Sequence, residues 1–312
     1  RPNPPGLNPW TSSLTYTCAD QGLNAVQFRV LDAGGNNSGT CFALINVVDD
    51  LAPTAQCQDI VVDLNLPAGP SPNNVDVFAT QINNGSFDNC TPSGSLNLRI
   101  RKGTAGPFQP IGVPINFNCS EVGDNLVELR VGDFNGNPNF CTAIVKVRDV
   151  TPPVAVAAPF IAVLSSTPGA GSVLVTPANI EAGSTDNCGI VKYEISRTSS
   201  TTGFSQTGVT FTCADLALPN PETVWLRVMD EGDGTTGNSH VVATTVTVVD
   251  NTNPTAVCQT AVVQLNNSGV GTLTPAMVDG GSFDNCSFTL SVSPNTFNCG
   301  NIGVNNVTLT AT

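Results

Sequence analysis

The same short motifs return in this chain at intervals of about 100 residues. One ends strand-like stretches as VVDD, VRDV and VVDN, and its aspartate is followed by a proline four residues later. The other reads GSFDNC or GSTDNC. The aspartates are Asp49, Asp149 and Asp250 in the first motif and Asp88, Asp186 and Asp284 in the second. Because both series keep one spacing, the chain is built from repeats.

A third motif places an aromatic residue two positions before a cysteine, and it occurs at Cys18, Cys119, Cys213 and Cys299. An alternating apolar stretch follows each copy, such as Val127-x-Leu129-x-Val131, which is typical of a β-strand with one buried face. The chain has 29 Gly and 23 Pro, and charged residues make up only 11%. This composition favours short strands joined by tight turns over helices.

The repeats divide the chain into four segments. Residues 50–149 and 150–250 are expected to be complete modules, residues 1–49 the C-terminal part of one, and residues 251–312 the N-terminal part of another. We expect that the chain was cut from a longer array. Units of about 100 residues can each close a two-sheet sandwich. The predicted fold is therefore all-β, with tandem immunoglobulin-like β-sandwich modules in an elongated array.

The 11 cysteines are expected to form disulfides, because the chain has no C-x-x-C pair and a single histidine, which does not suit a zinc or redox site. Cys57 and Cys141 lie eight residues after one boundary aspartate and eight before the next. The following segment has Ala157 and Val242 at these two positions. Because the next segment lacks both cysteines together, the two cysteines are expected to bond to each other, and we predict a Cys57–Cys141 bridge.

The cysteines of the other two motifs are expected to pair within each segment. The predicted bridges are Cys90–Cys119, Cys188–Cys213 and Cys286–Cys299. Three cysteines remain, Cys18, Cys41 and Cys258, and we expect their partners in parts of the repeat that this chain does not include. A bridge between Cys18 and Cys41 is an open alternative.

The recurring aspartates are predicted to converge where one module meets the next. In an immunoglobulin-like sandwich, the loops that carry the DNC and D-x-x-G-N motifs lie at the end where the chain enters. Carboxylates this close repel one another, and a calcium ion with six to eight oxygen ligands would relieve the repulsion. The predicted ligands are Asp49, Asp50, Asp88 and Asp133 at one joint, Asp149, Asp186 and Asp230 at the next, and Asp250 and Asp284 at a partial third. Turn chemistry alone is the alternative, since Asp, Asn and Gly suit turns.

Other classes of function are disfavoured by the composition. A net charge of -13 with only 11 Lys and Arg argues against a nucleic-acid surface. The most apolar stretch, residues 154–164, is too short to cross a bilayer, so no membrane insertion is expected. His240 has no counterpart in the other repeats, and no G-x-S-x-G motif appears. We therefore predict that this segment is not an enzyme.

The order of motifs, D-x-T-x-P-x-A-x-C, then G-S-x-D-N-C, F-x-C, D-x-x-G-N and V-x-D, covers the chain and resembles the hyalin-type (HYR) immunoglobulin-like repeat. It is especially similar to repeats in giant surface adhesins of gliding, type IX-secreting bacteria. The resemblance implies an extracellular, cell-surface stalk or filament. Neighbouring repeats, surface polysaccharide and other cell-surface proteins are the implied partners.

Two functions are consistent with such repeats. One is a structural and adhesive stalk, stiffened by disulfides and by calcium between modules. The other is a carbohydrate-binding or spacer region of a secreted multidomain enzyme. Sugar binding normally uses exposed aromatic platforms, and the chain has only two Trp and two Tyr, none at a repeated loop position. The stalk is therefore favoured.

Overall fold

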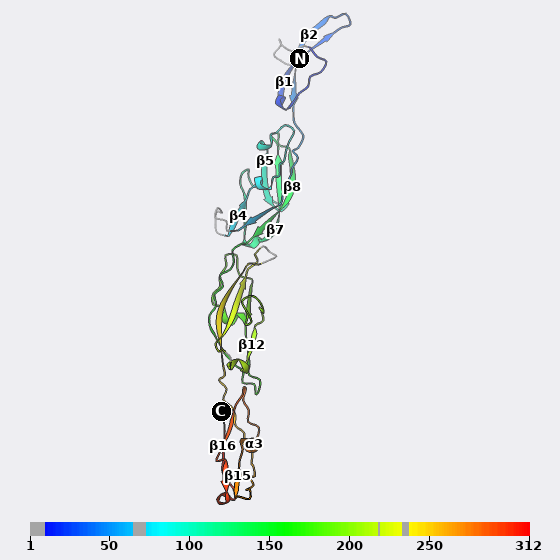
Figure 1. Cartoon of the computed structure of the whole chain (residues 1–312). Helices are drawn as coiled ribbons and strands as arrows, with labels where there is room; N and C mark the ends of the chain where they lie inside the picture. Colours follow the sequence, from blue (N-terminus) through cyan, green and yellow to red (C-terminus); the bar gives the residue numbers. More distant parts are fainter. Residues whose placement is uncertain (1–9, 65–72, 218, 233–236) are drawn as a thin grey trace. The chain divides into compact units, whose positions relative to one another are not determined.

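The computed structural model describes residues 10–64, 73–217, 219–232 and 237–312. These residues form two compact units, one built mainly from residues up to 150 and the other mainly from residues 151 onward (Figure 1). None of the described helices is long and apolar enough to span a membrane.

Residues 50–149 form a sandwich of two sheets. One sheet has four strands in the order β3-β8-β7-β5, and the other pairs β4 with β6. The β3–β8 pair is parallel and the other pairs are antiparallel. The bounds are β3 (Ile60–Asp63), β4 (Asn74–Val77), β5 (Asn97–Lys102), β6 (Ile115–Asn118), β7 (Gly123–Gly132) and β8 (Pro138–Arg148).

The core of this sandwich follows the predicted alternation. Val127, Leu129 and Val131 of β7 are fully buried, as is Phe117 of β6, the aromatic residue of the F-x-C motif. Side chains from both sheets therefore fill one core, and the predicted all-β, immunoglobulin-like sandwich is confirmed.

The strands before residue 50 form a single hairpin, β1 (Gly22–Leu31) with β2 (Asn37–Val47). Val26 of β1 is buried, but Phe28 is 60% exposed and Val30 is 54% exposed. The alternating pattern predicted a buried face here. That face is largely exposed because residues 10–49 contain no second sheet to cover it.

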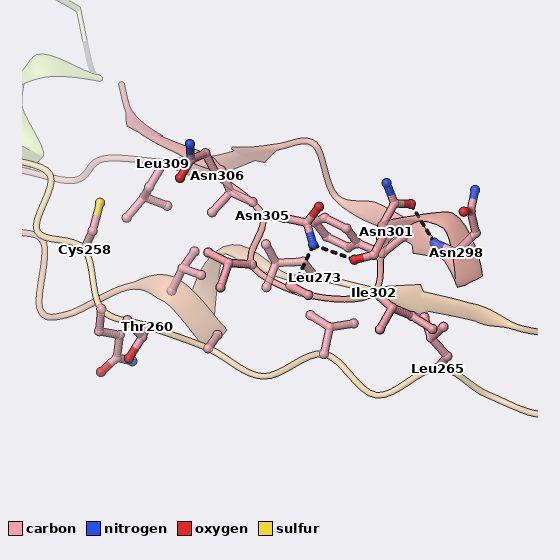
Figure 2. Close-up of a pocket in the computed structure, with 18 residues that line it drawn as sticks. Cys258, Thr260, Leu265, Leu273, Asn298, Asn301, Ile302, Asn305, Asn306 and Leu309 are labelled. Carbon is pink, nitrogen blue, oxygen red and sulfur yellow. Dashed lines mark hydrogen bonds between the residues drawn. The ribbon is translucent and has the colours of Figure 1, made fainter.

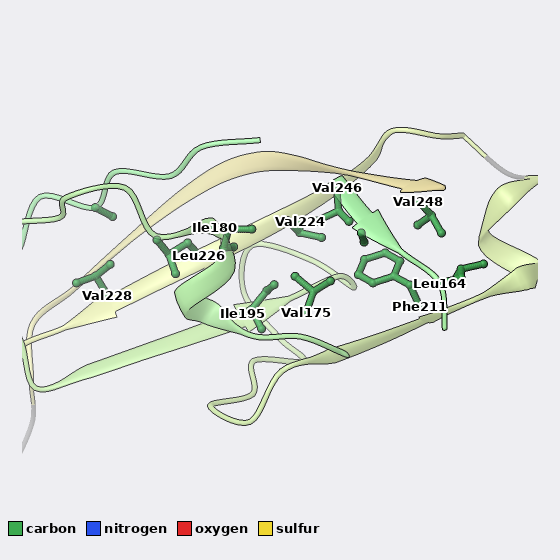
Figure 3. Packing of buried hydrophobic residues seen from close by; sticks show 12 residues of the cluster. Leu164, Val175, Ile180, Ile195, Phe211, Val224, Leu226, Val228, Val246 and Val248 are labelled. Carbon is green, nitrogen blue, oxygen red and sulfur yellow. The ribbon is translucent and has the colours of Figure 1, made fainter. Parts of the chain in front are cut away.

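Residues 150–250 repeat the same topology, with a sheet in the order β11-β13-β14-β9 and a second sheet of β10 and β12. Phe211 of β12 packs in a cluster with Ile195, Leu226 and Val246 (Figure 3). The bounds are β9 (Phe160–Val163), β10 (Ser172–Val175), β11 (Lys192–Ser196), β12 (Val209–Thr212), β13 (Glu222–Met229) and β14 (Ser239–Val249).

Residues 251–312 form part of a further sandwich of the same type. β15 pairs with β17, and β16 pairs with β18. The bounds are β15 (Val270–Thr272), β16 (Leu290–Ser293), β17 (Thr296–Asn298) and β18 (Thr308–Ala311). Leu273, Val278, Phe297 and Leu309 form a small buried core.

Short helices join the strands at repeated positions. The bounds are α1 (Ala79–Ile82), α2 (Pro177–Ile180), α3 (Pro275–Val278), η1 (Cys18–Asp20), η2 (Ser93–Ser95), η3 (Cys119–Glu121), η4 (Cys213–Leu216) and η5 (Cys299–Asn301). Every F-x-C or Y-x-C cysteine opens a 3-10 turn. In η3 the side chain of Asn118 accepts a hydrogen bond from the Ser120 amide, and the Glu121 carboxylate accepts one from the Asn118 amide. The motif therefore closes a turn in all four copies, and its aromatic residue is buried in the three F-x-C copies, whereas Tyr16 is half-buried.

Candidate calcium site and disulfide bridges

Three of the four aspartates predicted for the first joint lie together. Asp49 follows β2, Asp88 lies in the loop before β5, and Asp133 directly follows β7. One carboxylate oxygen of each lies within 4.8 Å of the others. Asp133 is 1% exposed and the other two are half-buried. The fourth, Asp50, is exposed and lies outside this cluster.

Asp88 has one satisfied and one unsatisfied oxygen. Its Oδ2 accepts hydrogen bonds from the amides of Cys90 at 3.0 Å and Thr91 at 2.7 Å, which is the turn chemistry expected of the DNC motif. Its Oδ1 is buried without a hydrogen-bond partner, and so are the same atoms of Asp186 and Asp284. A buried oxygen without a partner costs free energy, and all three DNC motifs contain one.

Asp133 is held by the loop that it begins. Its Oδ1 accepts a hydrogen bond from the Asn137 amide at 2.8 Å, and its Oδ2 accepts one from Asn137 Nδ2 at 2.7 Å. Asn135 and Asn137 also donate through Nδ2 to the backbone carbonyl of Asp49, at 2.9 and 3.1 Å. The D-x-x-G-N loop therefore fixes both Asp133 and the chain that enters from the preceding hairpin.

The same loop geometry occurs in the hairpin, where Asn36 contacts Asp32. The hydrogen bonds from the Asn36 side chain and backbone lower the pKa of the Asp32 carboxyl below its ordinary value. In the hairpin this loop therefore favours the ionised form of Asp32.

The donor set of Asp49, Asp88 and Asp133 fits calcium. Two oxygens bound to one ion at about 2.4 Å cannot lie more than about 4.8 Å apart, and the three carboxylates meet this limit. The partnerless Oδ1 of Asp88 supplies a position where a hard cation would satisfy a buried charge. Turn chemistry explains the hydrogen bonds of Oδ2 and leaves Oδ1 unexplained.

The partial third joint repeats one contact of the first. Asn285 Nδ2 donates to Asp250 Oδ1 at 2.9 Å, as Asn89 Nδ2 donates to Asp49 Oδ1 at 3.2 Å. Asp284 is 7% exposed. Among the described residues, no third acidic group completes a cluster with Asp250 and Asp284.

The aspartates predicted for the second joint belong to different units. Asp149 belongs to the first unit, and Asp186 and Asp230 belong to the second. Asp186 Oδ2 accepts a hydrogen bond from the Cys188 amide at 2.8 Å. Asp230 is buried and accepts one from the Asn238 amide at 2.7 Å. Residues 233–236, which lie between Asp230 and Asn238, are outside the described residues.

The Cys57–Cys141 bridge is confirmed, with a Cα–Cα distance of 5.8 Å. The predicted pairing of the DNC and F-x-C cysteines within each segment is wrong. The structure contains Cys18–Cys90 and Cys213–Cys286 bridges, so Cys90 bonds to the preceding segment. Neither Cys90–Cys119, nor Cys188–Cys213, nor Cys286–Cys299 forms. Cys119 and Cys188 are disulfide-bonded, whereas Cys41, Cys258 and Cys299 are free and exposed.

Strand geometry explains the correction. Cys119 lies just before the start of β7, whereas Cys90 lies before β5, whose first residue, Asn97, pairs with Gly132 at the end of β7. The 10 residues of β7 at about 3.3 Å each therefore separate the two cysteines by about 30 Å. A disulfide needs Cα atoms within about 7 Å. The order of the strands contained this signal, because the two motifs precede strands that run in opposite directions.

The Cys18–Cys90 bridge adjoins the carboxylate cluster. Cys18 Sγ lies 3.4 Å from the Asn89 carbonyl oxygen, and the Asn89 side chain donates to Asp49. A disulfide, three side-chain amides that donate to Asp49, and three carboxylates thus meet where residues 10–49 join residues 50–149.

The single histidine has a structural contact. His240 Nδ1 accepts a hydrogen bond from the Ala155 amide at 3.0 Å, which ties β14 to the start of its own segment. This contact occupies one of the two ring nitrogens of His240.

No protein-family model and no curated protein sequence matches this chain. Some solved structures are similar to it. Immunoglobulin domains 1–4 of Sidekick-1 are 11% identical, with a TM-score of 0.32, over 76% of this chain and 60% of that one. The N-terminal four Ig domains of Dscam1 isoform 1.9 are 10% identical, with a TM-score of 0.35, over 72% and 54%. Human mucin-like protocadherin EC1–2 is 10% identical, with a TM-score of 0.30, over 65% and 100%.

The chain thus spans about 60% or less of the Sidekick-1 and Dscam1 structures. The immunoglobulin-like assignment rests on the strand topology of this chain.

Proposed function

We propose that this chain is a structural and adhesive stalk segment of a long extracellular protein and has no catalytic role. In this proposal residues 50–149 and 150–250 are complete modules, and residues 1–49 and 251–312 are parts of two more. Disulfides and calcium together fix one module against the next.

The observation that carries the proposal is the coincidence of a covalent bridge and an acidic cluster at one boundary. Cys18–Cys90 joins the hairpin to the following sandwich, and Asp49, Asp88 and Asp133 converge beside it. An enzyme or a simple flexible spacer has no need to fasten the entry point of a sandwich twice. A stalk needs this, because a free joint would let the array fold back on itself.

The repeat register extends the proposal to the other joints. Asp149, Asp186 and Asp230 hold the corresponding sequence positions in the next repeat, and Asp250 and Asp284 do so in the last. The resemblance to HYR repeats adds a cell-surface location, with gliding motility and type IX secretion as its bacterial context. Surface polysaccharide and other cell-surface proteins are the proposed ligands.

Calcium is expected to raise the melting temperature of the chain with its disulfides intact. At 100 times a dissociation constant of about 10⁻⁴ M, binding would stabilise the folded state by about 2.7 kcal/mol. Differential scanning calorimetry in calcium and in excess chelator measures this shift, and small-angle scattering of the same samples reports whether the joints stiffen.

Two variants make the test specific to the cluster. Asp88→Asn keeps one oxygen for the turn and removes the charge, so it is expected to abolish most of the calcium effect. Asp50→Asn makes the same change at an exposed aspartate outside the cluster and should leave the effect intact. An identical melting temperature with calcium and with chelator would rule out ion-fixed joints and leave a stalk fastened by disulfides alone.

A further inference from the structure

The outer face of the four-stranded sheet of residues 50–149 carries two arginines next to each other. Arg99 of β5 and Arg130 of β7 are directly opposite in the antiparallel ladder. Their neighbours on the two strands, Ile100 and Leu129, are fully buried, so both arginine side chains point away from the core. Directly opposite residues have Cβ atoms about 4.5–5.5 Å apart, and like charges in such a pair are destabilising.

Neither arginine has a charge partner in the part of the chain that the structure describes. Glu128, the acid on this face of β7, is already bound to Arg101, whose Nε donates to it at 2.7 Å. The Nε of Arg99 is buried and has no hydrogen-bond partner. A buried polar group without a partner costs free energy, and two unpaired guanidinium groups leave room for an anion from outside the chain.

The next sandwich shows the paired form of the same arrangement. There Glu194 holds the position of Arg99 and lies opposite Arg227. Arg227 donates through Nε to Glu194 Oε2 at 2.7 Å, and Glu194 is only 4% exposed. Residues 50–149 therefore have a second arginine where the neighbouring sandwich has the carboxylate that neutralises the first.

In the last repeat the two positions are uncharged. Leu309, which lines a pocket of about 600 Å³ (Figure 2), corresponds to Leu129 of β7. Thr310 is therefore the counterpart of Arg130, and Ser291 pairs with it. Among the three sandwiches, the arginine pair thus belongs to residues 50–149 and is not a general feature of the repeat.

An aromatic ring borders the arginine pair. Phe140 of β8 is opposite Arg130 on the other side of β7 and is 46% exposed. Phe108 packs against Phe140 with ring centroids 5.8 Å apart, and the Arg101 guanidinium lies 4.3 Å from the centre of the Phe108 ring. The face therefore combines two unpaired positive charges with an exposed apolar ring that a packed neighbour holds in place.

We propose that Arg99 and Arg130 bind the carboxylate or sulfate group of an acidic polysaccharide, with the sugar ring packed on Phe140. This inference rests on the proposed function and gives its polysaccharide ligand a site and a chemical class. The planar guanidinium groups match the oxygens of such an anion. A dense polyanion such as a nucleic acid is disfavoured, because the net charge of -13 repels it, whereas one acidic sugar meets only the local pair.

Isothermal titration calorimetry of the whole chain with three hexasaccharides tests the proposal. Hyaluronan supplies carboxylates, a sulfated galactan supplies sulfates, and chitohexaose is neutral. An acidic hexasaccharide is expected to bind at least about tenfold more tightly than the neutral one, and the tighter of the two identifies the anionic group. Equal affinity for neutral and acidic sugars, or no binding of either acidic sugar, would overturn the proposal.

The protein is first dialysed free of calcium, so this result is independent of the carboxylate cluster. A chain that fails to bind sugar but still gains stability from calcium would therefore lose this inference and keep the stalk.

Charge variants test the arginine pair. Arg99→Glu gives this ladder the ion pair of the next sandwich, so it is expected to keep the fold by circular dichroism and to weaken binding by about tenfold or more. Arg227→Gln removes one positive charge at the equivalent position, where Glu194 is already bound, and should bind like the unaltered chain. Unchanged affinity of the Arg99→Glu variant would contradict the proposal.

Two further measurements test the occupant. Phe140→Ala is expected to weaken hexasaccharide binding several-fold, and an unchanged affinity would remove the ring from the site. Light scattering without sugar is expected to show no self-association that depends on Arg99. Self-association that Arg99→Glu abolishes would make a second copy of the chain the occupant and overturn the polysaccharide site.

Discussion

Replacing both Cys57 and Cys141 by serine is expected to lower the free energy of unfolding of the sandwich of residues 50–149 by about 4.5 kcal/mol. The bridge closes a loop with a sequence separation of 84 residues, and its removal returns the corresponding entropy to the unfolded chain. The chain's two tryptophans, Trp10 and Trp225, both lie outside this sandwich. Hydrogen exchange followed by mass spectrometry therefore measures the loss, as reduced protection of β7 and β8.

The neighbouring sandwich provides the reciprocal experiment. Ala157 and Val242 occupy the two bridge positions there, and cysteines at both are expected to raise protection of β13 and β14. Unchanged protection of β7 and β8 in the serine variant would show that the other disulfides already restrict the unfolded chain as much as this one does.

Phe211→Ala is expected to lower the free energy of unfolding of residues 150–250 by about 3 to 5 kcal/mol. The ring is fully buried between the two sheets, and truncation leaves a cavity that the rigid strands cannot close. This sandwich has no counterpart of the Cys57–Cys141 bridge, so little else offsets the loss. Trp225 of β13 reports the transition by fluorescence in a urea titration.

Leu174→Ala is the matched control, because Leu174 precedes Val175 on β10 and is 54% exposed. A loss below about 0.5 kcal/mol is expected there. If the two variants unfolded at the same urea concentration, the F-x-C aromatic would have no special role in the core.

The sequence predicted those features of the fold and of the candidate site that depend on short local patterns. Alternation in Val127-x-Leu129-x-Val131 identified a buried strand, because side-chain direction in a strand has a period of two. The paired loss at Ala157 and Val242 identified one disulfide. The DNC and D-x-x-G-N motifs brought Asp88 and Asp133 to one cluster.

The wrong disulfides have a common cause. The spacing from each DNC cysteine forward to the next F-x-C cysteine varies, at 29, 25 and 13 residues, whereas the spacing back to the preceding aromatic-x-C cysteine is nearly constant, at 72, 69 and 73 residues. The prediction took the nearer cysteine of each segment, although the constant spacing and the direction of the intervening strand both favour Cys18 as the partner of Cys90. Exposure of Phe28 could not be read from alternation, since the pattern gives the face of a strand and not what covers it.

The two bridges of the first unit interleave along the chain, since Cys57 lies between Cys18 and Cys90, whereas Cys141 lies beyond them. When the ends are pulled apart, tension between Cys18 and Cys141 follows the shorter covalent route, the 39 residues to Cys57 and then the bridge. At about 3.5 Å per residue this route extends to about 140 Å, against about 430 Å for the uncrosslinked chain. Even if the sandwich unfolds under load, Cys18 and Cys141 can therefore separate to only about a third of the distance that the uncrosslinked chain would allow. The two disulfides thus limit the extension of the chain.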